Sequence, residues 1–181
     1  LDWHAVHYVK VEMDKIFGYD NFQNEIIWCY GGGGASKNRF ARKHDTILFY
    51  SKSKKHTFNM QFAPYKKHTP FHFNGTPFRS EGKILEDHWK IEIVGATSKV
   101  KTYATQKPEE LVKRIVLASS NKNDIVADFF CGSGSFLKVA HELGRSCIGC
   151  DSNQSAVLRL KSFTPSNKAC TRQGQVAPQF D

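Results

Sequence analysis

One stretch, DIVADFFCGSGSFLKVAHELGRSCIGCD at residues 124–151, limits the fold of this chain more than any other. Its first seven residues are mostly apolar and are predicted to form a buried strand. After a Gly-Ser loop, apolar residues recur at helical spacing up to Gly144, a residue type that commonly ends helices. We expect four of them to face inward: Phe136, Val139, Ala140 and Leu143. SCIGCD then forms the next strand, so the stretch predicts a βαβ unit and an α/β fold with a mostly parallel sheet.

The residues just before this unit, QKPEELVKRIVLASS at 106–120, predict another helix. Pro108 suits the first helical position, and Glu109 and Glu110 place acids where the helix dipole favours negative charge. Apolar residues repeat every three to four positions along the segment. They are Leu111, Val112, Ile115 and Val116.

The first half of the chain predicts a helix followed by a pair of strands. Apolar residues recur at approximately helical spacing from Asp2 to Phe17, and Gly18 follows as a stop signal. The runs NEIIWCYGGGG and DTILFYSKS predict two strands joined by a mobile, glycine-rich basic loop, with ILFYS as an antiparallel strand at one edge of the sheet. Pro and Gly interrupt residues 54–104, which we expect to be irregular.

Charge and composition narrow the class of protein. A chain of 181 residues with 40% hydrophobic content suits one globular domain, and a net charge of +9 indicates an anionic partner, most often nucleic acid. No run approaches the roughly 20 apolar residues of a membrane span, and LDWHAVHYVK lacks the layout of a signal peptide, so we expect a cytoplasmic protein. Five scattered cysteines indicate reduced thiols, and Cys147 with Cys150 lacks the second pair that a zinc site needs.

The Gly-Ser loop lies at the carboxyl end of a predicted strand, where α/β folds bind ligands. A P-loop is excluded because no Lys-Ser or Lys-Thr pair follows the glycines at P-loop spacing, and Leu137 stands where a dinucleotide site has a third Gly or Ala. Asp151, after the second strand, is placed to bond ribose hydroxyls, so adenosine without a pyrophosphate suits the unit. Two interpretations of Asp128 stay open: it faces a ligand ammonium, or it caps the turn.

The order of these segments resembles the amino-group DNA methyltransferases of the circularly permuted class, which includes the modification subunits of type III restriction systems. The resemblance is carried by TQKPEELVKRIVLASS and by the βαβ stretch, and it extends upstream to LDWHAVHYVKVEMDKIFGYDNFQNEIIWCY, SKNRFARKHDTILFYSKS and Trp89 in DHWKI. Nearly the whole chain is covered, up to about Lys161. The resemblance implies a Rossmann-like, S-adenosylmethionine-dependent methyltransferase fold with an antiparallel edge strand.

The resemblance also implies which residues bind S-adenosylmethionine. Asp151 would contact the ribose, and Thr105 and Lys107 would approach the methionine carboxylate, with which a lysine ammonium can pair. The residues around the methionine part would be Asp128, Phe130, Gly132, Ser133, Gly134 and Ser135. The loop departs from the family pattern, because Phe129 replaces the usual Pro and Ser135-Phe136 replaces a Thr pair.

A larger departure is an absence. The family's catalytic tetrapeptide, Asp or Asn followed by Pro-Pro and an aromatic residue, holds the flipped base by its amino group, and this chain contains no Pro-Pro pair. In the permuted order the motif precedes the segment matched by LDWHAVHYVK, so we expect an incomplete fold and an amino-terminally truncated fragment that is inactive alone. Residues 1–181 are interpreted as one partial domain, with 54–104 as an insertion able to contact DNA and 162–181 as a poorly structured tail.

The implied reaction of the complete enzyme is methyl transfer, without a metal, to an exocyclic base amine of double-stranded DNA, most often that of adenine, after the base leaves the helix. The loop between the two first strands is expected to contact phosphates, because Asp45 is the only acid between Ala35 and Lys67. Its candidate residues are Lys37, Arg39, Arg42 and Lys43.

A restriction subunit and a second copy of the chain are further candidate partners. Two alternatives stay open: a non-catalytic nucleic-acid-binding subunit with a relict fold and, more weakly, an NAD-dependent oxidoreductase.

Overall fold

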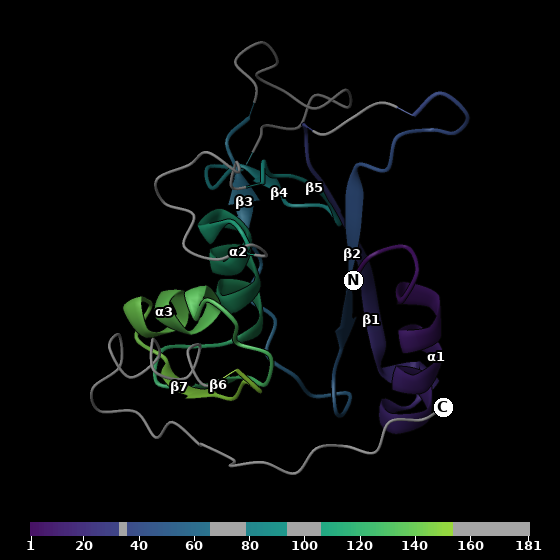
Figure 1. Cartoon of the computed structure of the whole chain (residues 1–181). Helices are drawn as coiled ribbons and strands as arrows, with labels where there is room; N and C mark the ends of the chain where they lie inside the picture. The colour runs from purple at the N-terminus through teal and green to yellow at the C-terminus, as the bar shows by residue number, and fades with distance from the viewer. Residues whose placement is uncertain (33–35, 66–78, 94–105, 154–181) are drawn as a thin grey trace. The chain divides into compact units, whose positions relative to one another are not determined.

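The computed structural model of the chain describes residues 1–32, 36–65, 79–93 and 106–153 (Figure 1). The chain divides into two compact units, Leu1–Ile93 and Val94–Asp181, and each is described by itself below. Thr105 and the tail 162–181 lie outside the described residues, so the expectations for them stay predictions. The interpretation of the chain as a single partial domain likewise stays a prediction.

The first unit begins with helix α1 (Val6–Phe17), which confirms the predicted helix and its end at Gly18. The helix starts later than Asp2 because that carboxylate accepts the backbone N–H groups of His4 and Ala5, both at 3.1 Å, and so forms a turn ahead of the helix. A short 3₁₀ turn, η1 (Tyr19–Asn21), leads from α1 into the sheet.

The sheet of the first unit has three strands in the order β2-β1-β5. Strand β1 (Phe22–Cys29) pairs with β2 (His44–Tyr50) in antiparallel register, which confirms the predicted strand pair and the antiparallel edge strand. On its other side β1 pairs in parallel with β5 (His88–Lys90). The stretch expected to be irregular therefore supplies a third strand, and it also forms the small pair β3 (Phe62–Ala63) and β4 (Lys83–Ile84).

Two tryptophans explain why so short a strand as β5 is held in the sheet. Trp28 and Trp89 are register partners across the parallel pair, with exposed fractions of 2% and 7%. The indole of Trp28 donates to the carbonyl of Ile91 at 2.8 Å, and that of Trp89 donates to the carbonyl of Glu86 at 2.7 Å. Both buried polar atoms are thus satisfied while the rings fill the core.

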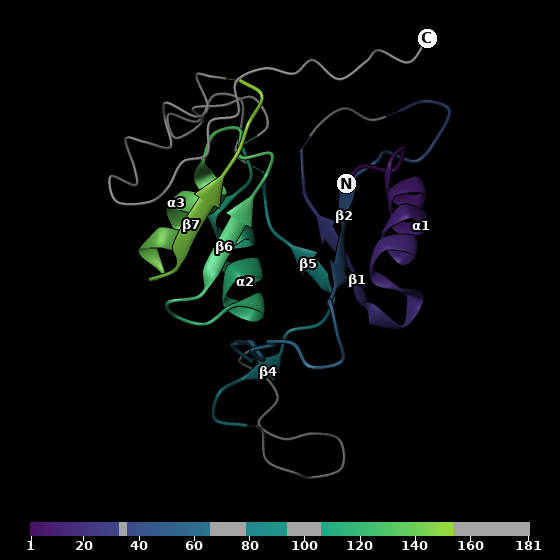
Figure 2. The same ribbon diagram turned by 90° about the horizontal axis from the view of Figure 1, so that it is seen from below.

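The second unit contains the predicted βαβ arrangement (Figure 2). Helix α2 (Glu109–Ser119) precedes strand β6 (Ile125–Asp128), helix α3 (Ser135–Glu142) and strand β7 (Ser146–Gly149). The strands β6 and β7 pair in parallel, with Ile125 opposite Ser146 and Asp128 opposite Gly149. The order of both helices and both strands is as the sequence predicts, although α2 begins one residue later than expected, with Pro108 as its N-cap.

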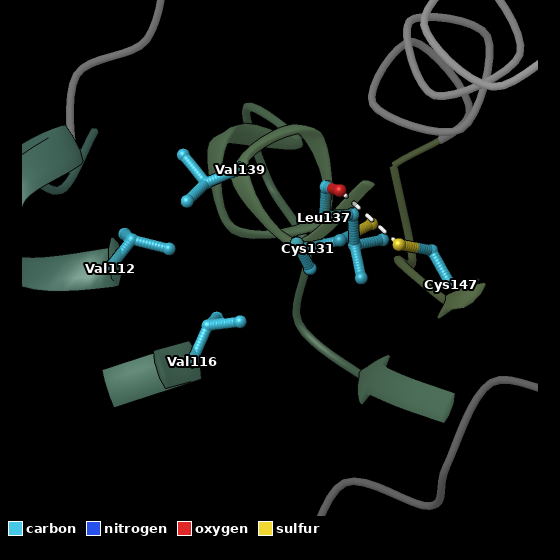
Figure 3. Close-up of a cluster of buried hydrophobic side chains, with 7 residues drawn as sticks. Val112, Val116, Cys131, Leu137, Val139 and Cys147 are labelled. Atoms are coloured by element: carbon cyan, nitrogen blue, oxygen red, sulfur yellow. Dashed lines mark hydrogen bonds between the residues drawn. The ribbon is translucent and has the colours of Figure 1, made fainter. Parts of the chain in front are cut away.

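The core of the second unit lies between α2, α3 and the strands (Figure 3). Its buried members are Val112, Val116, Cys131, Leu137, Val139, Ala140 and Cys147. The four residues predicted to face inward do so, since Val139 and Ala140 are buried and Phe136 and Leu143 are partly buried against the core. Leu137, which is 2% exposed, was not predicted to be buried. The reason is that α3 packs against both the strands and α2, so its buried face is wider than a single contact would require.

The strand predicted to be buried at residues 124–130 is shorter and more exposed than expected. Strand β6 ends at Asp128, and the side chains of Phe129 and Phe130 are 64% and 92% exposed. Helix α3 packs on the face of the ladder that carries Cys147, whereas Ile125 on the opposite face is 69% exposed. Alternate residues of a strand point to opposite faces, so covering one face leaves half of β6 exposed.

Candidate functional site

The Gly-Ser loop turns the chain sharply from β6 into α3. Gly132 has φ 46° and Gly134 has φ 74°, both in the left-handed region that glycine adopts without a steric penalty. The N–H of Gly134 donates to the carbonyl of Cys131 at 2.7 Å, which closes the turn. The hydroxyls of Ser133 and Ser135 share a hydrogen bond of 3.1 Å, so both side chains lie together at the start of the helix.

The ends of β6 and β7 stay paired beyond the regular strands. The N–H of Cys150 donates to the carbonyl of Asp128 at 2.9 Å, and the N–H of Cys131 donates to the carbonyl of Cys150 at 3.1 Å. These bonds hold the residues that follow β7 against the loop that follows β6. The acid after each strand is thereby brought to the same edge of the sheet.

Asp151 accepts two backbone hydrogen bonds with its carboxylate. Oδ2 accepts the N–H of Gly132 at 2.7 Å, and Oδ1 accepts the N–H of Asn153 at 2.8 Å. Asp128 accepts the N–H of Phe130 at 3.0 Å, which is the turn-capping role considered for it from the sequence. A carboxylate offers about four lone-pair sites, so neither acid is saturated by these bonds.

The electrostatics of the loop favour a positively charged ligand. Burial raises the pKa of the Asp128 carboxyl, the N–H of Phe130 opposes that shift, and the carboxylate of Asp151 adds to it. Burial also raises the pKa of the Cys131 thiol to about 11, and the charges of Asp151 and Asp128 add to the shift. A cation bound beside the Asp128 carboxylate would favour its charged form.

The structure brings together most of the predicted cofactor residues. The loop and strand-end cluster contains Asp128, Phe130, Gly132, Ser133, Gly134, Ser135 and Asp151. Lys107 is exposed and lies just before Pro108 at the start of α2. Thr105 falls outside the described residues. Contact of any of these residues with a ligand stays a prediction.

The predicted basic loop, whose described part is residues 36–43, joins β1 to β2. Lys37 and Arg39 are exposed. The guanidinium of Arg42 lies over the ring of Trp3, 3.3 Å from its centroid, and the ammonium of Lys43 donates to the carbonyl of Gly32. The loop therefore presents some cations to solvent and uses others to fix its own conformation.

Sequence reasoning missed two residues that shape this loop. Glu92 accepts the N–H of Gly31 at 2.9 Å, a bond between residues 61 positions apart that has no local signal. Phe40 is 96% exposed between the cations of the loop. The interleaved pattern NRFARK is the signal that could have identified Phe40.

Among the residues that the structure describes, no group of three or more His, Cys, Asp or Glu side chains could hold a metal ion. No described helix is long and apolar enough to cross a membrane.

A parallel βαβ unit with a left-handed glycine loop and an acid after each strand defines an α/β protein of the Rossmann-like, ligand-binding class. Comparison with known sequences makes the identification more specific. Residues 1–161 match the DNA methylase family of the N6/N4 type, and the chain belongs to that family.

Several similar proteins are type II methyltransferases. The chain is 40% identical over 156 residues to the type II methyltransferase M1.MboII of Moraxella bovis, an alignment covering 75% of this chain and 60% of the relative. It is 36% identical over 142 residues to M.HpaI of Haemophilus parainfluenzae, covering 77% of this chain and 44% of the relative. The chain thus spans less than two thirds of the length of these relatives.

Solved structures show the same fold. The M1.HpyAVI–SAM complex matches with a TM-score of 0.59 at 20% identity, over 90% of this chain and 70% of that one. The cytosine-N4-specific PvuII DNA methyltransferase matches with a TM-score of 0.57 at 16% identity, over 81% of this chain and 52% of that one. The predicted family and the methyltransferase fold are confirmed, and the oxidoreductase alternative is not favoured.

Proposed function

We propose that this chain forms the S-adenosylmethionine-binding part of a DNA amino-methyltransferase, with adenine as the target base. The observation that carries the proposal is the meeting of Asp128, the left-handed glycine loop and Asp151 at the ends of two parallel strands. It occurs in a chain of the N6/N4 DNA methylase family. The type II methyltransferases that resemble the chain, and the SAM complex of M1.HpyAVI, support the same activity.

The residues of the loop fit the chemical groups of S-adenosylmethionine. Asp151 keeps lone pairs that can accept the ribose hydroxyls, and Asp128 places negative charge where the ligand carries an ammonium and a sulfonium. Ser133 and Ser135 offer hydroxyls at the start of α3 for the methionine carboxylate. Lys107, from the segment before α2, would add an ammonium for the same carboxylate.

Bound S-adenosylmethionine supplies an activated methyl group, and the residues of this chain hold and orient it. Precise positioning of the methyl donor is a large part of the rate that such a site can contribute. The groups that would hold the target amine are not among these 181 residues, since no Pro-Pro pair occurs in them. The chain is therefore proposed to supply the cofactor half of the site.

Double-stranded DNA is the proposed macromolecular partner. The net charge of +9 and the exposed cations Lys37 and Arg39 support phosphate contacts from the basic loop. Arg42 and Lys43 are proposed to join them, although Arg42 stacks on Trp3 and Lys43 binds Gly32 in the free chain. Such contacts position a protein on DNA without reading its sequence.

Calorimetric titration with S-adenosylmethionine tests the proposal. The full chain should bind it saturably and should not bind NAD. Asp151→Ala and Lys107→Ala should each weaken binding by about tenfold or more, the scale of one lost charged hydrogen bond. Glu142→Ala on α3, whose side chain is 46% exposed, should leave binding unchanged. Binding of NAD in place of S-adenosylmethionine would overturn the proposal.

A second candidate is a nucleic-acid-binding subunit without catalysis, which the absence of a Pro-Pro pair favours. Adding a purified segment that carries the Asp-Pro-Pro-Tyr type motif distinguishes the two. Restored methyl transfer to DNA supports the enzyme, and inactivity despite binding of cofactor and DNA supports the subunit. A restriction subunit, a homodimer and a cytoplasmic location stay predictions.

A further inference from the structure

Phe40 is exposed to an unusual degree. Its side chain is 96% exposed, the highest value among the large apolar side chains that the structure describes. Between Ser36 and Lys43 the chain carries four cations and no acid. An isolated exposed aromatic ring needs no explanation, but a ring at the centre of a cationic loop combines the two groups that bind nucleic acid.

The loop that carries Phe40 is fixed at its base. The N–H of Tyr30 donates to the carbonyl of Lys43 at 3.0 Å, which continues the pairing of β1 and β2 into the loop. Gly31 is held by its N–H bond to Glu92, and a Cβ at Gly31 would lie only 2.6 Å from the carboxylate oxygen. The phenyl ring is thus presented by an anchored loop.

The cations of the loop divide into two roles. Arg42 already stacks on Trp3, and the ammonium of Lys43 binds a loop carbonyl. Lys37 and Arg39, which lie three and one residues before Phe40 in the sequence, are exposed to solvent. The loop therefore presents an exposed apolar ring together with two exposed cations that can reach phosphates close to it.

We propose that Phe40 inserts between stacked bases of duplex DNA while Lys37 and Arg39 hold the flanking phosphates. The inference rests on the proposed function and adds a positioning residue to it. Apolar side chains that enter a base step unstack it, and base–aromatic stacking is worth about 1–3 kcal/mol per base. A base that leaves the helix leaves a gap, and a ring in the stack lowers the cost of that step.

The charge around the ring is the reason to choose DNA as its partner. Burying Phe40 in an apolar protein groove would bring Arg39 and Lys37 close to that groove without an anion to pair with them. A base stack places anionic phosphates next to the apolar faces of the bases. Duplex DNA satisfies both parts of the loop in one contact.

Binding of the full chain to a duplex containing 2-aminopurine tests the inference. Emission of 2-aminopurine should rise when the wild-type chain binds, because insertion unstacks the base. Phe40→Ala should abolish the rise and weaken binding by about 5- to 100-fold, with the salt dependence unchanged. Lys37→Ala should instead reduce the salt dependence. Tyr8→Ala, which removes another exposed ring, 78% exposed on α1, is the matched control and should behave as wild type.

The possible failures are distinguishable. A wild-type chain that binds S-adenosylmethionine but no duplex overturns the proposed DNA contact and this inference with it. Duplex binding with the same affinity and emission for Phe40→Ala overturns the insertion alone, as does a flat 2-aminopurine signal in wild type. If Phe40→Ala also loses S-adenosylmethionine binding, Phe40→Trp replaces it in the test. The emission of the added indole should be quenched when the variant binds the duplex. Unquenched emission overturns the insertion.

Discussion

Gly132 donates its backbone N–H to Oδ2 of Asp151 at 2.7 Å, a bond that links residues 19 positions apart. The carboxylate proposed to bind the ribose therefore also fixes the loop proposed to receive the methionine part. The two functions of Asp151 can be separated, because only the acceptor atom is needed for the loop while the negative charge strengthens a bond to the ribose.

Asp151→Asn and Asp151→Ala are expected to differ for this reason. The amide oxygen of Asn can still accept the N–H of Gly132, so the Asn variant should lose about tenfold in S-adenosylmethionine affinity, and the Ala variant about 100-fold. Calorimetry measures the affinities, and hydrogen exchange at Gly132 measures the loop. Equal affinities for the two variants, or equal protection of Gly132, would show that the loop bond does not contribute.

Asp128→Asn should stabilise the free chain and weaken cofactor binding. Burial raises the pKa of Asp128 in the folded state, so its charge opposes folding at pH 7. The folded chain loses stability as the pH rises from the pKa of the unfolded state through the raised pKa of the folded state. Removing the charge should raise Tm by about 1–3 °C at pH 7. The difference should shrink as the pH falls through the raised pKa of Asp128, because the wild-type carboxylate then takes up a proton.

Calorimetric titration of the same Asp128→Asn variant with S-adenosylmethionine completes this test. The neutral amide no longer attracts the ammonium or sulfonium, so affinity should fall while Tm rises. A Tm difference that persists unchanged at acid pH would contradict the electrostatic explanation.

The thiols are expected to react in an order set by burial. The pKa of Cys131 is raised to about 11, and burial raises that of Cys147, so few thiolates form there at neutral pH. Cys29 and Cys150 are only partly buried. Timed alkylation with iodoacetamide followed by peptide mass spectrometry should label Cys29 and Cys150 before Cys131 and Cys147. Early labelling of Cys131 would mean that the loop opens readily.

Local patterns in the sequence were sufficient to predict the described helices and strands of the second unit, although not the end of β6. The apolar spacing of α2 and α3 and the runs that became β6 and β7 each carry a period that a single segment displays. Gly18 and Gly144 also mark helix ends by their own chemistry. The same holds for the pair of β1 and β2, whose aromatic and β-branched runs are long enough to show a strand.

Contacts between distant residues could not be predicted in this way. Strand β5 is three residues long, and its pairing depends on Trp89 lying beside Trp28. Leu137 is buried because two different layers cover α3, which no periodicity of α3 alone reveals. The family resemblance identified the loop and Asp151 as a site, but their direct hydrogen bond is a property of the folded chain.

Arg145 should be a sensitive position for stability in the described part of the second unit. It is 8% exposed, and its guanidinium donates to the hydroxyl of Ser120 at 3.1 Å, to the carbonyl of Ser120 at 2.6 Å and to the carbonyl of Leu143 at 2.6 Å. These bonds tie the end of α2 to the turn between α3 and β7. Arg145→Ala leaves buried carbonyls unpaired and should cost about 2–4 kcal/mol, seen as a fall in Tm of about 5–10 °C. Arg145→Lys should recover only part of the loss, since an ammonium cannot reproduce the planar fork of the guanidinium.

Lys138→Ala on the exposed side of α3 is the control. A Tm for Arg145→Ala within 1 °C of that control, about 0.3 kcal/mol, would mean that water replaces the lost bonds.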